Sequence, residues 1–166
     1  MALMAAEELG IDVYSITPVV ADTEAVGFTD VTEGSRATFA TGKAVVEACR
    51  ELKVELCRRA AQTMGVDEAE VEWVDGAAVS PSHGGEPLTL AAITAQAKRT
   101  GGPLTATASL NAAGAGPSFA VHCADLKVDE ETGQTAIVRY TAVQDAGTAI
   151  HPSYVEGQMQ GGSVQG

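Results

Sequence analysis

A long run of helical periodicity over residues 35–64 limits the folds open to this chain more than any other segment does. Apolar side chains recur in it at spacings of three and four residues, which places them on one face of a helix. Gly65 ends the run as a C-terminal cap, and Gly42 marks either a close approach or a break. We therefore expect one long helix that packs on the core. Its core-facing residues are Val45, Cys49, Leu52, Leu56 and Ala60, and the charged residues off that face are Arg50, Glu51, Glu55, Arg58 and Arg59.

Strand patterns occupy much of the remaining chain. Pro18 lies in one of them and indicates an edge strand or a bulge, because proline cannot donate to a ladder. Asp75-Gly76 predicts a type I′ turn in a hairpin, and the acidic turn at 129–133 predicts a second hairpin. The expected strands are 13–20, 71–74, 77–79, 103–110, 119–128 and 135–143.

Three further helices complete the predicted elements. Residues 1–9 predict a helix that ends at Gly10, residues 88–98 a short helix, and residues 153–166 a C-terminal helix. The strands do not alternate with helices, which disfavours a parallel sheet. The order predicts an α+β fold of two layers, a mostly antiparallel sheet with the long helix and shorter helices on one face. At 166 residues, we expect a single domain over 1–166 that folds without a disulfide or a metal.

The composition excludes several classes of partner. The net charge is −12, from 22 acidic and 10 basic residues, and it repels nucleic acid and anionic membranes. No apolar run approaches the roughly 18 residues that a membrane span needs. Cys49, Cys57 and Cys123 lack the spacing of a metal site or of a disulfide. They predict reduced core thiols in a reducing compartment, the cytoplasm.

A candidate anion site lies over residues 33–38, at the start of the long helix. Gly34 leaves the backbone accessible, while Ser35 and Thr38 supply hydroxyl groups at a positive helix end. Arg36 supplies a planar fork that suits phosphate. In the alternative interpretation Ser35 only caps the helix and Arg36 is solvated. The chain contains neither a standard phosphate motif nor the G-x-S-x-G elbow of a serine hydrolase.

The C-terminal segment is unusually rich in glycine for a predicted helix. Its glycines lie four residues apart in two pairs, Gly157 with Gly161 and Gly162 with Gly166. Each glycine costs a helix about 1 kcal/mol relative to alanine, so a close neighbour must compensate. That neighbour is either a ligand or a tightly packed helix. The neutral amides that would suit the edge of a heterocycle are Gln158, Gln160 and Gln165.

The histidines do not form a recognisable site. His83, His122 and His151 are scattered, and no H-x-x-x-H or C-x-x-C motif is present, so we expect no metal bound by protein side chains. His122 lies in an alternating strand and is interpreted as a hydrogen-bonded core residue. Asp145 is interpreted as a turn former, with a place in a site as the alternative.

Four blocks, in register over nearly the whole chain, resemble the molybdenum hydroxylases. This family includes xanthine dehydrogenases, aldehyde oxidoreductases and the large subunits of carbon monoxide dehydrogenases. The first block is similar to the helix after the family's G-Q-G cofactor loop, and the last block is the most specific. The blocks are 5–11; 21–23 with 34–38; 41–45; and the last, which runs from 121–129 through 132–133 and 145–147 to 157–158 and 161–162.

The resemblance implies a cofactor and the residues that hold it. In this family the large subunit holds molybdopterin, often as a cytosine dinucleotide, and the pterin dithiolene binds the molybdenum. The resemblance places Gln158 close to the metal and the helix start around the pterin or its phosphate. We expect the two segments to converge on one pocket. The implied cofactor-binding residues are Gly34, Ser35, Arg36, Ala37, Thr38 and Gln158.

The resemblance also implies which parts of the enzyme lie elsewhere. The family's catalytic glutamate is in a G-x-G-E segment expected beyond Gly166, so no catalytic residue is assigned and the chain is expected to be a truncated, inactive part of the subunit. The whole enzyme would hydroxylate aldehydes or N-heterocycles with oxygen derived from water. The expected partners are the rest of the molybdenum subunit, iron–sulfur and flavin subunits or domains, and further copies of the chain. The alternative is a non-enzymatic α+β module that binds a ligand or partner through its glycine-rich C-terminal face.

Overall fold

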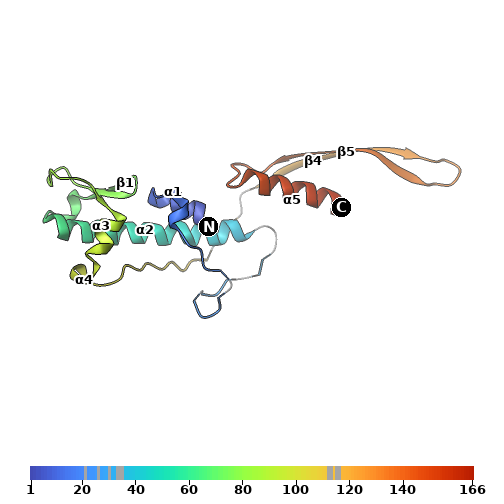
Figure 1. Ribbon diagram of the computed structural model, residues 1–166. Coiled ribbons are helices and arrows are strands. Elements are labelled where there is room, and N and C mark those ends of the chain that lie inside the picture. Colours follow the sequence, from blue (N-terminus) through green and yellow to red (C-terminus); the bar gives the residue numbers. More distant parts are fainter. Residues whose placement is uncertain (21, 26, 30, 33–35, 112–113, 115–116) are drawn as a thin grey trace. The chain divides into compact units, whose positions relative to one another are not determined.

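The computed structural model divides into two compact units, Met1–Ala113 and Gly114–Gly166. It describes all residues except 21, 26, 30, 33–35, 112–113 and 115–116. Each unit combines helix with antiparallel strand (Figure 1), which confirms the α+β class. The first unit contains α1 (Ala2–Leu9), α2 (Arg36–Met64), β1 (Glu72–Val74), β2 (Ala77–Val79), β3 (Leu88–Thr89), α3 (Leu90–Ala95) and α4 (Ala97–Thr100), and the second contains β4 (Phe119–Val128), β5 (Thr135–Asp145) and α5 (Pro152–Gln165).

Helix α2 forms one side of the core of the first unit, as its periodicity predicted. Leu56 and Ala60 of the predicted stripe are fully buried, and Cys49 is buried as well. The helix packs against the three-stranded sheet β1-β2-β3 and against α3, which closes the core. The core cluster consists of Leu56, Ala60, Ala61, Val71, Ala78 and Ile93.

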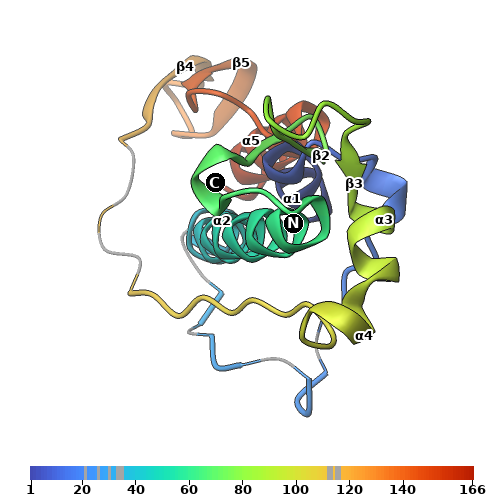
Figure 2. The same ribbon diagram turned by 90° about the vertical axis from the view of Figure 1, so that its left-hand side faces the viewer.

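Helix α1 packs on α2 through a close approach at Gly42 (Figure 2). A Cβ atom at Gly42 would lie only 2.6 Å from the sulfur of Met4, so the predicted close approach is confirmed. An ion pair joins the same helices, because Lys53 Nζ lies 2.5 Å from Glu8 Oε1. Glycine at position 42 therefore lets the two helix surfaces meet.

The hairpin β1-β2 has the predicted turn. Asp75 and Gly76 have φ values of 47° and 80°, and positive φ at both central positions is the signature of a type I′ turn. Trp73 on β1 donates its indole N–H to the carbonyl oxygen of Leu9, with 2.8 Å between the two atoms. The hairpin therefore holds the C-terminal end of α1.

The strand predicted at 13–20 is wrong. The described structure contains a short 3-10 helix over Val13–Ser15 and no strand in this segment. The side chain of Asp12 accepts a hydrogen bond from the backbone N–H of Tyr14 at 2.9 Å, which caps the turn. Local side-chain capping overrides the β-propensity of valine and isoleucine where no neighbouring strand offers a ladder.

The prediction of one helix over 88–98 is only partly right. Residues 88–89 pair with β2 as strand β3, and the helical part is divided into α3 and α4 at Gln96. Thr89 begins α3, since its hydroxyl accepts a hydrogen bond from the backbone N–H of Ala92 at 3.2 Å. A cap residue inside the apolar run thus sets the boundary between strand and helix.

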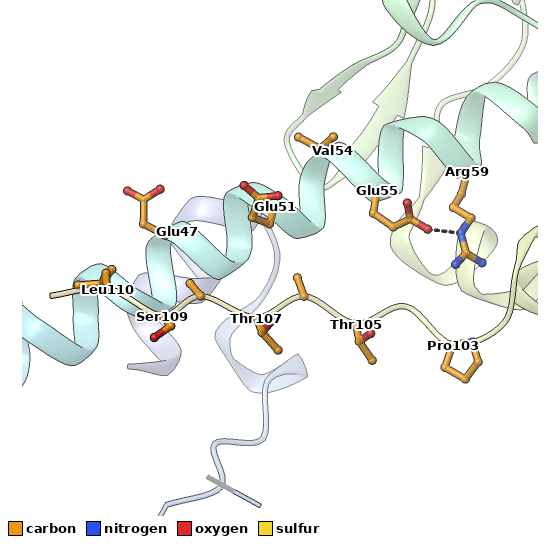
Figure 3. Close-up of a pocket in the computed structure, with 12 residues that line it drawn as sticks. Glu47, Glu51, Val54, Glu55, Arg59, Pro103, Thr105, Thr107, Ser109 and Leu110 are labelled. Carbon is orange, nitrogen blue, oxygen red and sulfur yellow. Dashed lines mark hydrogen bonds and ion pairs between the residues drawn. The ribbon is translucent and has the colours of Figure 1, made fainter. Parts of the chain in front are cut away.

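The strand predicted at 103–110 is wrong as a ladder strand. The segment is extended (Figures 1 and 3), but no described residue pairs with it. Its odd-numbered residues are exposed and its even-numbered residues are half-buried. That alternation is typical of a strand with one face on a helix. The predicted alternation is therefore present, but no described strand pairs with the segment.

In the second unit β4 and β5 form the predicted hairpin. The register pairs Phe119 with Asp145 and Val128 with Thr135, and a bulge interrupts it after Asp125. Both faces of β4 are exposed, so His122 and Cys123 are not the core residues that the alternation predicted. A two-stranded hairpin cannot bury either face without a further layer.

Among the described residues, no helix combines the length and apolar character that crossing a membrane requires.

Candidate cofactor-binding site

The first predicted half of the site lies at the start of α2. The described helix begins at Arg36, and Gly34 and Ser35 lie outside the described residues. The guanidinium group of Arg36 donates to the carbonyl oxygen of Val31 at 3.4 Å, so it turns back to the preceding loop. Ala37 is half-buried and Thr38 is exposed, which leaves the Thr38 hydroxyl accessible.

The second predicted half of the site lies on α5, in the second unit. Val155, Met159 and Ser163 are half-buried and recur every four residues, so they form the side of α5 that is turned away from solvent. At about 100° per residue, Gly157 and Gly161 lie on the opposite side of the helix. Apart from the adjacent residues and the backbone of α5 itself, no described atom lies within 4 Å of a Cβ atom built at either glycine. The backbone there is bare and open.

Gln158 flanks this open backbone. Its side chain is exposed and makes no hydrogen bond with any residue that the structure describes. By contrast, Gln160 donates to a carboxylate oxygen of Glu156 at 3.1 Å. Gln158 therefore presents a neutral donor and acceptor beside exposed backbone, and the described residues supply no packed helix on that side.

The predicted site residues belong to two different units. Arg36, Ala37 and Thr38 are in the first unit and Gln158 is in the second. Each half of the site is therefore described by the geometry of its own unit. Their convergence on one pocket stays a prediction.

The other polar residues of the second unit have local roles. The His122 ring nitrogen Nδ1 lies 2.7 Å from the Tyr140 hydroxyl, and the His151 ring stacks on Tyr154 with 4.1 Å between ring centroids. Asp145 accepts a hydrogen bond from the backbone N–H of Gly147 at 2.9 Å, which confirms it as a turn former. In the described part of the chain, no three His, Cys, Asp or Glu side chains are grouped as a metal site would require.

A groove of about 710 Å³ runs between α2 and the extended segment 103–110 (Figure 3). Arg59 lies at one end of it and is only 5% exposed, so its placement off the core face in the sequence prediction is wrong. Its guanidinium group contacts Glu55 at 2.5 Å and donates to the carbonyl oxygen of Gly102 at 2.9 Å. The spacing of Glu55 and Arg59, one helical turn apart, was the available signal for this pair.

The two arginines beside Glu55 change its acidity. Hydrogen bonds from Arg58 first, and then from Arg59, lower the pKa of the Glu55 carboxyl group from 4.5 to about 2. Because the pKa is lower in the folded state, the stabilisation is complete above the unfolded value and is lost as the pH falls from 4.5 toward 2. We therefore expect the wild-type chain to lose stability across this window.

We predict that Glu55→Gln flattens this pH dependence, because glutamine cannot be protonated there. The measurement is the free energy of unfolding in urea at a series of acidic pH values. The exposed Glu70, in the short 3-10 helix Glu68–Glu70, forms no ion pair with any described residue and provides the control substitution Glu70→Gln. Equal slopes for wild type and Glu55→Gln would contradict the assignment.

Comparison with known proteins identifies a family and several relatives of this chain. The family model described as "Molybdopterin cofactor-binding domain" matches residues 1–166. The carbon monoxide dehydrogenase large chain of Hydrogenophaga pseudoflava is 28% identical over 99% of this chain and 21% of its own length. The xanthine dehydrogenase molybdenum-binding subunit of Escherichia coli O157:H7 is 27% identical over 98% of this chain and 22% of its own length.

A solved structure has the same fold. Reconstituted CO dehydrogenase from Oligotropha carboxidovorans superposes with a TM-score of 0.76 at 25% identity, over 97% of this chain and 21% of that protein. The chain thus spans about a fifth of the length of the relatives that it matches. Because the family model covers it from end to end, the chain belongs to the molybdopterin cofactor-binding domain family.

Proposed function

We propose that the chain is part of the molybdenum-binding subunit of a molybdenum hydroxylase and contributes to its cofactor site. The match of the family model to every residue of the chain carries this proposal. The open face of α5 supports it, because the bare backbone at Gly157 and Gly161 beside the Gln158 amide fits the edge of a flat heterocycle.

The residues have distinct proposed roles. Gln158 would donate to and accept from the pterin close to the metal. The start of α2 would face the pterin or its phosphate, where backbone N–H groups and the Thr38 hydroxyl favour an anion. Molybdopterin, when bound, supplies the redox centre and holds molybdenum through its own sulfur atoms. The proposed contacts at the start of α2 are Gly34, Ser35, Arg36, Ala37 and Thr38.

The activity of the whole protein is part of the same proposal. Relatives named xanthine dehydrogenase support an N-heterocycle as substrate, with an aldehyde as the other candidate. The electrons would leave through iron–sulfur and flavin subunits or domains. Cys49, Cys57 and Cys123 are unpaired in the structure, which supports a reducing compartment such as the cytoplasm.

We predict that Gln158→Leu lowers cofactor retention roughly two- to tenfold, the effect of losing one hydrogen bond. The natural polypeptide that carries residues 1–166 would be produced in a host that makes molybdopterin. Molybdenum and pterin are then measured per polypeptide after dialysis. The matched control is Gln160→Leu, because Gln160 lies on a different side of α5 and is already bonded to Glu156.

The outcomes separate two functions. Loss of pterin in Gln158→Leu alone, with unchanged thermal unfolding, supports a cofactor contact at Gln158. Equal loss in both variants contradicts that contact. Absence of molybdenum and pterin from the wild-type polypeptide would contradict the proposed function and favour a non-enzymatic module that binds a partner through α5.

A further inference from the structure

The backbone N–H and C=O groups of the extended segment 103–110 form no hydrogen bonds with other described residues. Its even-numbered residues are half-buried and its odd-numbered residues are exposed. In Figure 3 Thr105 and Thr107 point away from α2, so the peptide groups lie to the sides of the segment. No backbone hydrogen bond joins these residues to any other described residue. The segment is therefore an extended chain on α2 whose backbone groups form no hydrogen bond with other described residues.

The groove beside this strand has room for another chain. Its volume of about 710 Å³ lies between α2 and the strand, and both line it. A polypeptide in the groove could pair with the strand on one side and place alternate side chains against α2. Extended peptides bind exposed strand edges in this way, with main-chain hydrogen bonds for affinity and side chains for specificity.

The charged residues of α2 that line the groove determine which side chains a bound polypeptide should carry. Glu47, Glu51 and Glu55 line the groove. Glu55 is neutralised by Arg58 and Arg59, and Glu47 contacts Arg50 at 3.0 Å. Glu51 has no ion pair or hydrogen bond with any described residue. The groove therefore presents uncompensated negative charge halfway along its length, which a cation would neutralise.

We propose that this groove binds an extended polypeptide segment with lysine or arginine at alternate positions, which adds to residues 103–110 as a β-strand. Its basic side chains would meet Glu51 and Glu47, and its backbone would pair with the strand. No described residue of the first unit fills the groove. The inference does not depend on the cofactor or on the proposed function.

The test uses the whole chain and a peptide of alternating valine and lysine, as long as the segment 103–110. Amide hydrogen exchange is followed residue by residue by NMR. We expect every second amide of 103–110 to exchange about tenfold more slowly when the peptide is at about ten times its Kd. Only alternate amides respond, because successive N–H groups of a strand point to opposite sides.

Two control peptides separate backbone pairing from charge. The same peptide with N-methylated amides at alternate positions cannot pair and should not slow exchange. A peptide of alternating valine and glutamate should not bind, because Glu47 and Glu51 repel it. Protection by the acidic peptide equal to that by the basic one would overturn the proposal.

Substitutions on α2 then locate the charge contact. Glu51→Gln should raise the Kd of the basic peptide roughly two- to fivefold at low salt, which is the range for the loss of one exposed ion pair. The matched control Glu70→Gln, outside the groove, should leave its Kd unchanged. Slower amide exchange confined to the exposed hairpin β4-β5 would also overturn the proposal. So would unchanged amide exchange over 103–110 at a saturating concentration of the peptide.

Discussion

Replacement of Leu56 by alanine is expected to lower the free energy of unfolding of the first unit by about 2–5 kcal/mol. Leu56 is fully buried at the centre of the core between α2, the three-stranded sheet and α3. Truncation removes apolar contacts and leaves a cavity that the surrounding helix and sheet cannot fill. Urea unfolding followed by the fluorescence of Trp73, the sole tryptophan of the chain, reports this unit directly.

The matched control is Val54→Ala on the same helix. Val54 is 61% exposed, so its truncation creates no cavity, and its expected effect is about 0.5 kcal/mol or less. Similar losses in the two variants would mean that Leu56 does not lie in a close-packed core. Alanine is favourable in a helix, so helix propensity does not account for a loss at position 56.

Replacement of Gly76 by alanine is expected to cost about 2–5 kcal/mol, from two independent causes. The residue has a φ of 80°, where a Cβ atom is strained. The same Cβ atom would lie 2.5 Å from the carbonyl oxygen of Gly10, a backbone atom that cannot rotate away. The substitution should therefore both weaken the type I′ turn and separate α1 from the hairpin.

Gly65→Ala separates these two causes. Gly65 has a φ of 71°, but apart from the adjacent residues no described atom lies within 4 Å of a Cβ atom built there. Its substitution should cost only the conformational term, about 1–2 kcal/mol. Equal losses at positions 65 and 76, measured by urea unfolding, would show that the approach of Gly10 to Gly76 contributes nothing.

Local patterns were sufficient where the element's own residues determine its structure. The long helix was predictable because its apolar face repeats over many turns, and the β1-β2 turn because Asp75-Gly76 tolerates positive φ. The strand at 13–20 was mispredicted for the opposite reason. Its β-branched residues suit a ladder, but Asp12 caps a 3-10 turn and no described strand lies beside it.

Part of the candidate site was likewise predictable from local sequence, and part depends on contacts between distant residues. Glycine spacing and neutral amides indicated α5 as a binding face, and the structure leaves Gly157 and Gly161 open beside Gln158. The burial of Arg59 was not predictable from the helical pattern. It depends on residues 100–102, more than forty positions away, which cover its guanidinium group. Whether the two predicted halves of the site meet is a question of tertiary arrangement.

Residue order alone therefore established the α+β class, the long helix, the two hairpins and the family resemblance, because each depends on short-range periodicity, turn chemistry or motif spacing. Three-dimensional packing decided which of these elements are covered. It buried Arg59, brought Gly10 against Gly76, and left 103–110 and both faces of β4 without a partner among the described residues. Burial and strand pairing are contacts between distant segments, so no local pattern contains them.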